Sequence, residues 1–300
     1  MGAEHGNEEA DVTTFSTDGP DSLVIVPTYN EAENLEPLVR QVLRRGLFDV
    51  LVVDDHSPDG TGQIADNLAS RFPGRVRVQH RIRKLGLGTA YLLGFRYALN
   101  TGYDRVFQMD ADFSHDPSYL PELRGALDHA DVVLGSRYAP GGGTRNWSAQ
   151  RQMISQWGSR FAGMVLGLPI QDLTGGFKGF RRRALRAINL EAIRSSGFAF
   201  QIEVTYRCRR RDLRIVEIPI VFEDRRRGHS KMSAAIVAEA FFQVWRLRLG
   251  PETATEPAPG ELVYHYPSEP AASRFLEVLT PDAHPRPVED PGGGPKEDQE

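Results

Sequence analysis

Cysteine is almost absent from this chain, and so are the features that mark a secreted or membrane-spanning protein. The single cysteine, Cys208, excludes a disulfide framework and a cysteine-rich zinc site. It lies in the Arg-rich stretch 207–214, where we expect a buried, unreactive thiol rather than a nucleophile. No N-terminal segment resembles a signal peptide, and no run reaches the roughly 18 apolar residues that a transmembrane helix needs. We therefore expect a cytoplasmic protein.

The sequence motifs of several large enzyme classes are also missing. There is no Gly-x-Ser-x-Gly elbow, no Walker Gly-x4-Gly-Lys-Ser/Thr loop, no His-Glu-x-x-His and no Cys-x-x-Cys. The partial glycine loop Gly86-Leu-Gly88 lacks the third glycine of a dinucleotide fingerprint and predicts a tight turn. Basic and aromatic residues are not interleaved as in a nucleic-acid-binding module, so we expect no nucleic-acid partner.

Charge is distributed unevenly along the chain. Residues 1–20 carry five acidic residues and no Lys or Arg, and residues 251–300 carry eleven acidic and three basic residues with ten of the twenty prolines. The middle has a net charge of +9, although the whole chain has −4. Such ends cannot bury enough apolar surface to offset the conformational entropy that ordering would cost. We expect a disordered acidic tail at 1–20, a folded domain at 21–250, and a largely disordered, acidic, Pro/Gly-rich tail at 251–300.

Strands alternate with helices in the first half of the predicted domain, because continuous apolar runs alternate with segments of helical spacing. The expected strands are 23–27, 50–53, 76–78, 106–109 and 132–134, and the expected helices are 31–45, 61–71, 88–100 and 117–128. Later come expected helices at 150–168 and 199–211, a strand at 213–222 and an apolar segment at 232–249. This order predicts an α/β fold: a doubly wound, mostly parallel sheet with helices on both faces.

Polar residues follow four of the predicted strands. They are Pro27-Thr-Tyr-Asn-Glu31, Asp54-Asp-His-Ser-Pro-Asp-Gly-Thr61, Asp110-Ala-Asp112 and Gly135-Ser-Arg137. Each could be ordinary turn and helix-capping chemistry. Ligands of open α/β sheets, however, bind beyond the carboxyl ends of the strands, so four such termini together predict one site at that edge.

The pair Asp110 and Asp112 suggests a divalent cation. Carboxylate oxygens select Mg²⁺ or Mn²⁺, which keep coordination positions open for substrate phosphates. The alternative is an acidic turn before the helix that begins near Pro117. If a metal and a diphosphate bind here, fixed cations should oppose the negative charge. The candidate cations are Arg137, Arg151, Arg225 and Lys231.

The four strand-end segments and Arg225…Gly228-His-Ser-Lys231 occur in one order across about 210 residues. In this combination the chain resembles the polyprenol (dolichol) phosphate mannose synthases, which are inverting glycosyltransferases of the GT-A fold, a Rossmann-like nucleotide-sugar fold. The resemblance implies transfer of mannose from GDP-mannose to a polyprenyl phosphate. It places the protein peripherally at the cytoplasmic face of a membrane, on the lipid surface itself or with a membrane-anchoring partner.

The resemblance also assigns residues. It implies that the nucleoside is bound by Pro27, Tyr29, Glu31, Val53 and Asp55, and that the donor and acceptor phosphates are bound by Arg137, Arg151, Arg225 and Lys231. It implies a diphosphate and metal site at Asp110 and Asp112, with a third metal contact at a family glutamine position that is Ser114 here. Asp112, Arg137, Arg225 and Lys231 are the residues expected to carry catalysis.

The expected reaction needs no catalytic base, because a phosphomonoester with its second pKa near 6 is mostly dianionic at pH 7. Two other functions stay open: a polyprenyl phosphate glucosyltransferase that uses UDP-glucose, and a catalytically silent subunit that binds nucleotide sugars. The lipid acceptor calls for an apolar surface, which the stripe at 157–168 and the segment 232–249 could provide. Both could equally be helices of the core.

Overall fold

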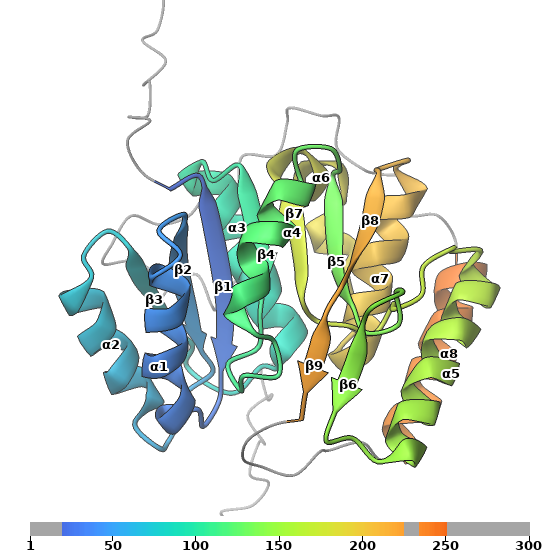
Figure 1. The fold of residues 1–300 in the computed structure, drawn as a ribbon, viewed down its shortest axis with the longest axis horizontal. Helices are drawn as coiled ribbons and strands as arrows, with labels where there is room; N and C mark the ends of the chain where they lie inside the picture. The colour runs from blue at the N-terminus through green and yellow to red at the C-terminus, as the bar shows by residue number, and fades with distance from the viewer. Residues whose placement is uncertain (1–19, 225–233, 251–300) are drawn as a thin grey trace, which may run out of the picture. The chain divides into compact units, whose positions relative to one another are not determined.

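The computed structural model describes residues 20–224 and 234–250, and its main element is a seven-stranded sheet in the order β3-β2-β1-β4-β7-β5-β8 (Figure 1). The strands are β1 Ser22–Thr28, β2 Phe48–Asp54, β3 Val76–His80, β4 Arg105–Gln108, β5 Val132–Ser136, β7 Lys178–Arg181 and β8 Ile215–Pro219. Only β7 runs antiparallel to its neighbours β4 and β5. The expected mostly parallel α/β sheet is confirmed.

Helices cover both faces of this sheet (Figure 1). On one face lie α1 Ala32–Leu43, α2 Thr61–Arg71 and α4 Leu120–Ala126, which follows the 3₁₀ turn η1 Pro117–Tyr119. On the other lie α3 Leu87–Thr101, α6 Arg182–Ala187 and α7 Gly197–Arg210, with the 3₁₀ turn η2 Leu190–Ala192 between the last two. Side chains from alternate strand positions, such as Val24 and Val26 of β1, pack on Leu35 and Leu38 of α1. This alternation is what buries both faces of a parallel sheet.

Two further helices pair beside α7. They are α5 Ala149–Leu166 and α8 Ala234–Leu249. The ring of Phe161 on α5 stacks on that of Phe241 on α8, with centroids 4.5 Å apart. Val244 of α8 is buried in the same apolar cluster as Ile202 of α7. Within the described ranges, no helix combines the length and the hydropathy required to cross a bilayer.

The structure corrects three details of the expected element order. Strand β7 was not expected; it fits between β4 and β5 because Gly179 leaves room where a Cβ would lie 2.6 Å from a ring carbon of Phe107. The expected strand 213–222 is two strands, because β9 Val221–Glu223 leaves the main sheet and pairs with β6 Gly143–Arg145. The expected helix 117–128 is a 3₁₀ turn followed by a short helix. Of the predicted tails only Pro20 lies within the described residues.

Candidate active site

The carboxyl ends of β1, β2, β4 and β5 meet at one edge of the main sheet, as the strand-end pattern predicted. Because β7 runs the other way, the glycine-rich loop 172–177 that precedes it reaches the same edge (Figure 1). Polar side chains from both halves of the fold are therefore brought to this edge.

Asp54 joins the ends of β1 and β2. Its buried carboxylate accepts hydrogen bonds from Thr28 Oγ1 at 3.0 Å, from the Ser57 backbone N–H at 3.1 Å and from Ser57 Oγ at 2.6 Å. Thr28 and Asp54 are Cα partners in the strand register. Charge-assisted hydrogen bonds of this kind are strong, so the two strand ends are held in a fixed relative position.

Asp55, predicted to bind the nucleoside, holds the loop that leads into α3. Its carboxylate accepts hydrogen bonds from the backbone N–H groups of Leu85 at 2.9 Å and Gly86 at 2.8 Å. The buried Arg81 lies 3.3 Å from the same carboxylate, measured from Nε to Oδ1. The structure thus places Asp55 at the β2 end of the site, where it positions the segment before α3.

The other residues predicted to bind the nucleoside lie around this point. Val53 is fully buried, and its Cα partner Pro27 is half-buried at the end of β1. Half-buried Tyr29 stacks with Lys84, whose Nζ is 3.4 Å from the ring centroid, the geometry of a cation–π contact. Glu31 precedes α1, where its backbone carbonyl accepts the first hydrogen bonds of the helix.

Asp110 and Asp112 are held by a tight turn after β4. Ser114 donates to Asp112 Oδ1 twice, from its backbone N–H at 3.0 Å and from its hydroxyl at 2.5 Å. Phe113, which lies between Asp112 and Ser114 in the chain, has a φ of 62°. The hydroxyl of Tyr91 on α3 donates to Asp110 Oδ1 at 3.1 Å. Burial and the neighbouring Asp110 raise the pKa of Tyr91 well above its usual value, so the phenol keeps the proton that it donates.

The donor set of this turn fits a magnesium or manganese ion. Asp110 and Asp112 offer carboxylate oxygens, and Ser114 offers a hydroxyl oxygen; hard oxygen ligands are what these cations prefer. Among residues 20–224 and 234–250, no cluster of three or more His, Cys, Asp or Glu side chains is arranged to hold a metal. Two carboxylates are enough where substrate phosphates complete the coordination, which is common for Mg²⁺.

His115 lies beneath the aspartates as a neutral ring. Its Nδ1 accepts a hydrogen bond from the backbone N–H of Asp110 at 3.1 Å, which leaves the ring proton on Nε2. The imidazole stacks on Phe177 with centroids 5.0 Å apart. Burial lowers the pKa of His115, although Asp110 and Asp112 act in the opposite direction. The ring is therefore suited to packing and hydrogen bonding.

Arg137, predicted to bind phosphate, forms a buried ion pair with Asp172. Its Nε and Nη2 atoms each lie 2.6 Å from one oxygen of the Asp172 carboxylate, and its backbone N–H donates to the same carboxylate at 3.0 Å. Nη2 also donates to Thr174 Oγ1 at 2.8 Å. Burial acts to raise the pKa of Asp172, but the Arg137 guanidinium lowers it below its usual value. In this arrangement Arg137 fastens the glycine-rich loop to the end of β5.

Arg151, the third predicted phosphate ligand, anchors the end of β9. Its Nη1 donates to Asp224 Oδ1 at 2.7 Å, and its guanidinium carbon lies 4.1 Å from a ring centroid of Trp147. Asp224 directly precedes Arg225 in the chain. Arg225 and Lys231 lie outside the described residues, so their predicted roles stay predictions.

Sequence reasoning missed several residues that build this edge. Asp172 had a partial signal, because it begins a recognisable glycine-rich loop, but its partner Arg137 is 35 positions away. Tyr91 and Gln201 lie inside helices, and no motif marks them. Lys84 stands in the loop after β3, and no motif marks it either.

A buried lysine lies behind the glycine-rich loop. Lys178 is fully buried on β7, and its Nζ donates to the backbone carbonyl of Gln201 at 2.7 Å and to Thr205 Oγ1 at 2.8 Å. Burial lowers the pKa of Lys178 to about 7. Nearby Cys208 is buried as predicted, and burial raises the pKa of its thiol to about 12, which makes the thiol unreactive.

We expect Lys178→Met to change how stability depends on pH. Between pH 7 and about 10.4, the usual lysine pKa, the unfolded chain binds a proton at this position that the folded chain does not. Wild-type stability therefore rises with pH in this window, by up to about 1.4 kcal/mol per pH unit from this group, and the variant lacks that contribution. Urea unfolding at pH 7.5, 8.5 and 9.5 measures the difference. If stability depends on pH in the same way in both proteins, the prediction is wrong. Lys84→Met, at an exposed lysine, is the matched control.

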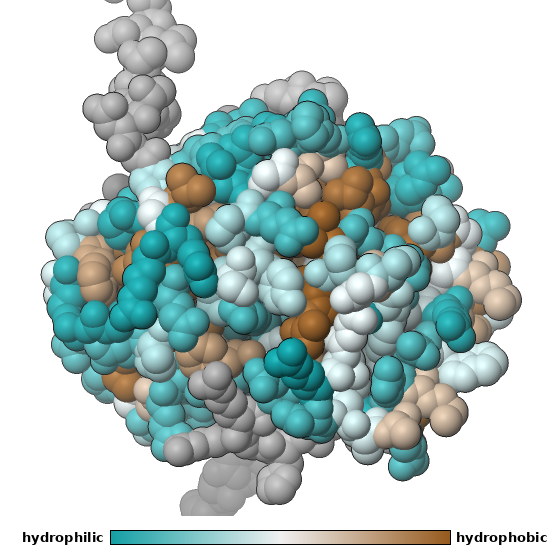
Figure 2. Space-filling view, in the orientation of Figure 1, coloured by the Kyte–Doolittle hydropathy of each residue, from teal (hydrophilic) through white to brown (hydrophobic). Residues whose placement is uncertain are grey.

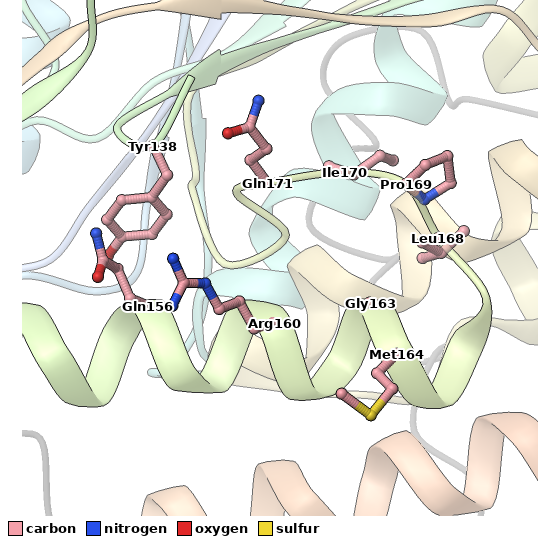
Figure 3. A pocket seen from close by; sticks show the side chains of 9 residues that line it. All are labelled: Tyr138, Gln156, Arg160, Gly163, Met164, Leu168, Pro169, Ile170 and Gln171. Carbon is pink, nitrogen blue, oxygen red and sulfur yellow. The ribbon is translucent and has the colours of Figure 1, made fainter. Parts of the chain in front are cut away.

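A pocket of about 470 Å³ lies between α5 and the segment that follows it (Figure 3). Figure 3 shows Tyr138 and Arg160 toward one end, with Met164 and Leu168 toward the other. Tyr138 follows Arg137, so the pocket adjoins the end of β5. Its cationic and apolar groups suit a ligand that is anionic at one end and apolar at the other.

Comparison with known proteins gives the family. The model of the family described as glycosyl transferase family 2 matches residues 23–188. That match includes the strand ends of β1, β2, β4 and β5 and the glycine-rich loop.

Curated relatives match over most of their own length. The chain is 51% identical over 226 residues to an undecaprenyl-phosphate mannosyltransferase of Micrococcus luteus, covering 75% of this chain and 92% of that protein. It is 46% identical over 231 residues to a polyprenol monophosphomannose synthase of Mycolicibacterium smegmatis, covering 76% and 87%. A dolichol-phosphate mannosyltransferase of Pyrococcus furiosus is 36% identical over 228 residues, covering 75% of this chain and 62% of that protein.

Among solved structures, glucosyl-3-phosphoglycerate synthase from Mycobacterium tuberculosis in complex with Mn²⁺ and UDP-glucose has a TM-score of 0.56 with 20% identity. The match covers 78% of this chain and 81% of that one. At this identity the likeness extends to the fold.

Proposed function

Because this chain belongs to glycosyl transferase family 2, we propose that it transfers mannose from GDP-mannose to a polyprenyl phosphate with inversion at the anomeric carbon. The product is a polyprenyl phosphate β-mannose, a lipid-linked sugar donor. The observation that carries the proposal is the turn at Asp110 and Asp112, which stands beside Tyr29 and Asp55 at the carboxyl edge of the sheet. The names of the relatives supply the sugar and the lipid acceptor.

In the proposed reaction, the acceptor phosphate attacks the anomeric carbon directly. A phosphate monoester is mostly dianionic at pH 7, so no side chain has to remove a proton. The buried, neutral His115 is consistent with this, because its Nδ1 is already occupied by a backbone N–H. The C–O bond to the nucleotide diphosphate breaks as the new C–O bond forms on the opposite face, and this single displacement inverts the centre.

The chain's own residues would stabilise the departing diphosphate. A Mg²⁺ or Mn²⁺ ion held by Asp110 and Asp112 would supply positive charge to the leaving group. Ser114 is placed to orient Asp112 through its 2.5 Å hydrogen bond and to offer its oxygen to the same cation. We assign Pro27, Val53 and Glu31 to the nucleoside, with Tyr29 and Asp55, and Arg151, Arg225 and Lys231 to the phosphates. Arg137 acts through its ion pair with Asp172, which sets the position of the glycine-rich loop.

We expect Arg225→Ala and Lys231→Ala each to reduce mannose transfer by at least about tenfold, because each removes a positive charge that we assign to phosphate binding. Rates of the purified variants, with circular dichroism as a test of folding, measure the effect. Arg226→Ala, a neighbouring arginine not assigned to the site, is the matched control. Unchanged rates for both variants would assign the pair to a solvated basic surface.

The proposed function is tested by label transfer from GDP-mannose into an organic-extractable product. Purified protein is incubated with polyprenyl phosphate and Mg²⁺ or Mn²⁺, with UDP-glucose in parallel. Mannose label that requires both metal and lipid supports the proposal. Label only from UDP-glucose would replace the donor and keep the mechanism, and nucleotide-sugar binding without transfer would favour a silent binding subunit.

We also propose that α5 and α8 contact a membrane surface, where the lipid acceptor resides. Trp157 and Met164 on α5 have exposed fractions of 65% and 83%, and Phe242 on α8 has 78%. In Figure 2 the surface over α1 and α2 is largely hydrophilic, and hydrophobic residues appear on the side of α5. The pocket beside α5 could receive the first apolar units of the acceptor at Met164 and Leu168.

We expect wild-type protein to float with anionic liposomes at low salt. The double variant Trp157→Ser/Phe242→Ser should bind at least about tenfold more weakly, because each exposed apolar side chain contributes about 1.5–3 kcal/mol when buried. Ile82→Ser is the matched control, since Ile82 is 58% exposed in the loop between β3 and α3. Absence of wild-type binding at low salt would remove the membrane part of the proposal.

A further inference from the structure

Three polar side chains lie around the position that a Cβ on Gly176 would take, in the glycine-rich loop that reaches the site, and we call this position the notch. A Cβ placed on Gly176 would lie 3.3 Å from His115 Cε1, 3.6 Å from Asp110 Oδ2 and 3.6 Å from Gln201 Nε2. Side chains from two elements, the turn after β4 and helix α7, therefore surround one point. The backbone at that point carries no side chain of its own.

The side-chain amide of Gln201 makes no hydrogen bond to the described residues. Gln201 lies on α7 with only 3% of its surface exposed, and within the described part of the chain neither its Nε2 nor its Oε1 has a hydrogen-bond partner. Its backbone carbonyl is fully used, because Lys178 Nζ donates to it at 2.7 Å and Thr205 Oγ1 at 2.9 Å. The backbone of Gln201 is thus fixed, and its amide Nε2 lies 3.6 Å from the position that a Cβ on Gly176 would take. A buried polar group without a partner costs about 1–3 kcal/mol, so an occupant that completes its hydrogen bonds is favoured.

The other two walls of the notch are fixed as well. The ring of His115 is held by Phe177 on one side and by the backbone N–H of Asp110 at Nδ1. Asp110 Oδ1 accepts from Tyr91, which orients Oδ2 toward the notch. A site held this firmly discriminates between ligands by small differences in their polar groups.

We propose that this notch is a subsite for a hydroxyl group of the donor sugar, with the Gln201 amide as its hydrogen-bond partner. A hydroxyl is both donor and acceptor, which matches an amide that offers both, whereas a phosphate offers acceptors alone. The Asp110 carboxylate beside it can accept a hydrogen bond from the same hydroxyl. Gln201 is then a specificity-determining residue for the sugar. The inference rests on the proposed function only in taking the donor to be a sugar nucleotide.

The test compares binding of the nucleotide with and without its sugar. Titration calorimetry with Mg²⁺ measures GDP and GDP-mannose on wild type and on Gln201→Leu. We expect the variant to lose at least about fivefold in affinity for GDP-mannose, which is the value of one to two lost hydrogen bonds, and less than about twofold for GDP. Gln41→Leu, on α1 at the other face of the sheet, is the matched control.

Gly176→Ala is the second variant, and it removes no polar group. Gly176 is not among the glycines of positive φ, so alanine is compatible with its backbone, and the added methyl occupies the notch. We expect the same selective loss for GDP-mannose. If Gln201→Leu does not fold, Gly176→Ala alone provides the comparison with wild type.

Equal losses for GDP and GDP-mannose would show a structural role for Gln201, and unchanged affinities would show that the notch holds only water; either result overturns the inference. If wild type binds UDP-glucose and not GDP-mannose, GDP-mannose is not the donor. The same comparison, made with UDP and UDP-glucose, then tests whether the notch binds a sugar hydroxyl. If wild type binds neither sugar nucleotide, both proposals are overturned.

Discussion

Asp112→Asn is expected to lower metal-dependent mannose transfer by at least about 100-fold, the effect typical of removing one charge-stabilising group. The substitution keeps the size of the side chain and an oxygen that can accept from Ser114, so the turn after β4 should persist. What it removes is the negative charge that would hold the cation. Transfer of label into lipid measures the rate, and thermal unfolding with and without Mn²⁺ and GDP measures the loss of metal-linked binding.

Asp116→Asn is the matched control for this result. Asp116 stands in the same loop, is exposed, and accepts a hydrogen bond from the backbone N–H of Ser118 at 2.8 Å. A rate close to that of wild type is expected. If Asp112→Asn also retains the wild-type rate and the Mn²⁺ effect, Asp112 does not hold the metal.

Asp172→Ala is expected to cost about 3–5 kcal/mol in the free energy of unfolding, because it leaves the buried Arg137 without its counter-charge. The same change removes the acceptor for the backbone N–H groups of Arg137 and Gly175. Urea unfolding measures the change. The double variant Arg137→Met/Asp172→Leu should recover much of the loss, since an apolar pair of similar volume leaves no unpaired charge.

Arg183→Ala is the control for an exposed ion pair. Arg183 pairs with Asp131 at the opposite edge of the sheet and is 72% exposed on its side chain. A change of about 0–1 kcal/mol is expected there. If Asp172→Ala costs no more than Arg183→Ala, the Arg137 and Asp172 pair does not hold the loop.

The first half of the fold was predictable because its strands are continuous apolar runs and its helices show helical spacing. Each feature is local, so β1, β2 and the helices after them could be assigned from neighbouring residues. Strand β7 carried no such signal. It is four residues long, Lys-Gly-Phe-Arg, and Lys178 is buried only because Gln201 and Thr205, more than 20 positions away, accept its hydrogen bonds.

The same distinction separates the parts of the site. Asp55, Asp110 and Asp112 follow parallel strands, and the rule that ligands bind beyond carboxyl ends predicts them as site residues. Asp172 and Gly176 precede an antiparallel strand, so that rule does not apply to them. The amide of Gln201 gains its place from the packing of α7 against the sheet, which no local pattern predicts.

The position of β7 also has a consequence for how the chain acquires its fold. Strands β4 and β5 are not hydrogen-bonded to each other, because β7 lies between them, and β7 follows β5 by roughly 40 residues. Closing a loop of this length costs entropy before any strand pairing repays it, so we expect β7 to pair after the more local pair of β1 and β2 has formed. A chain truncated before Lys178 would expose the inner edges of two hydrophobic strands. Such edges pair readily between molecules, so truncated chains should aggregate.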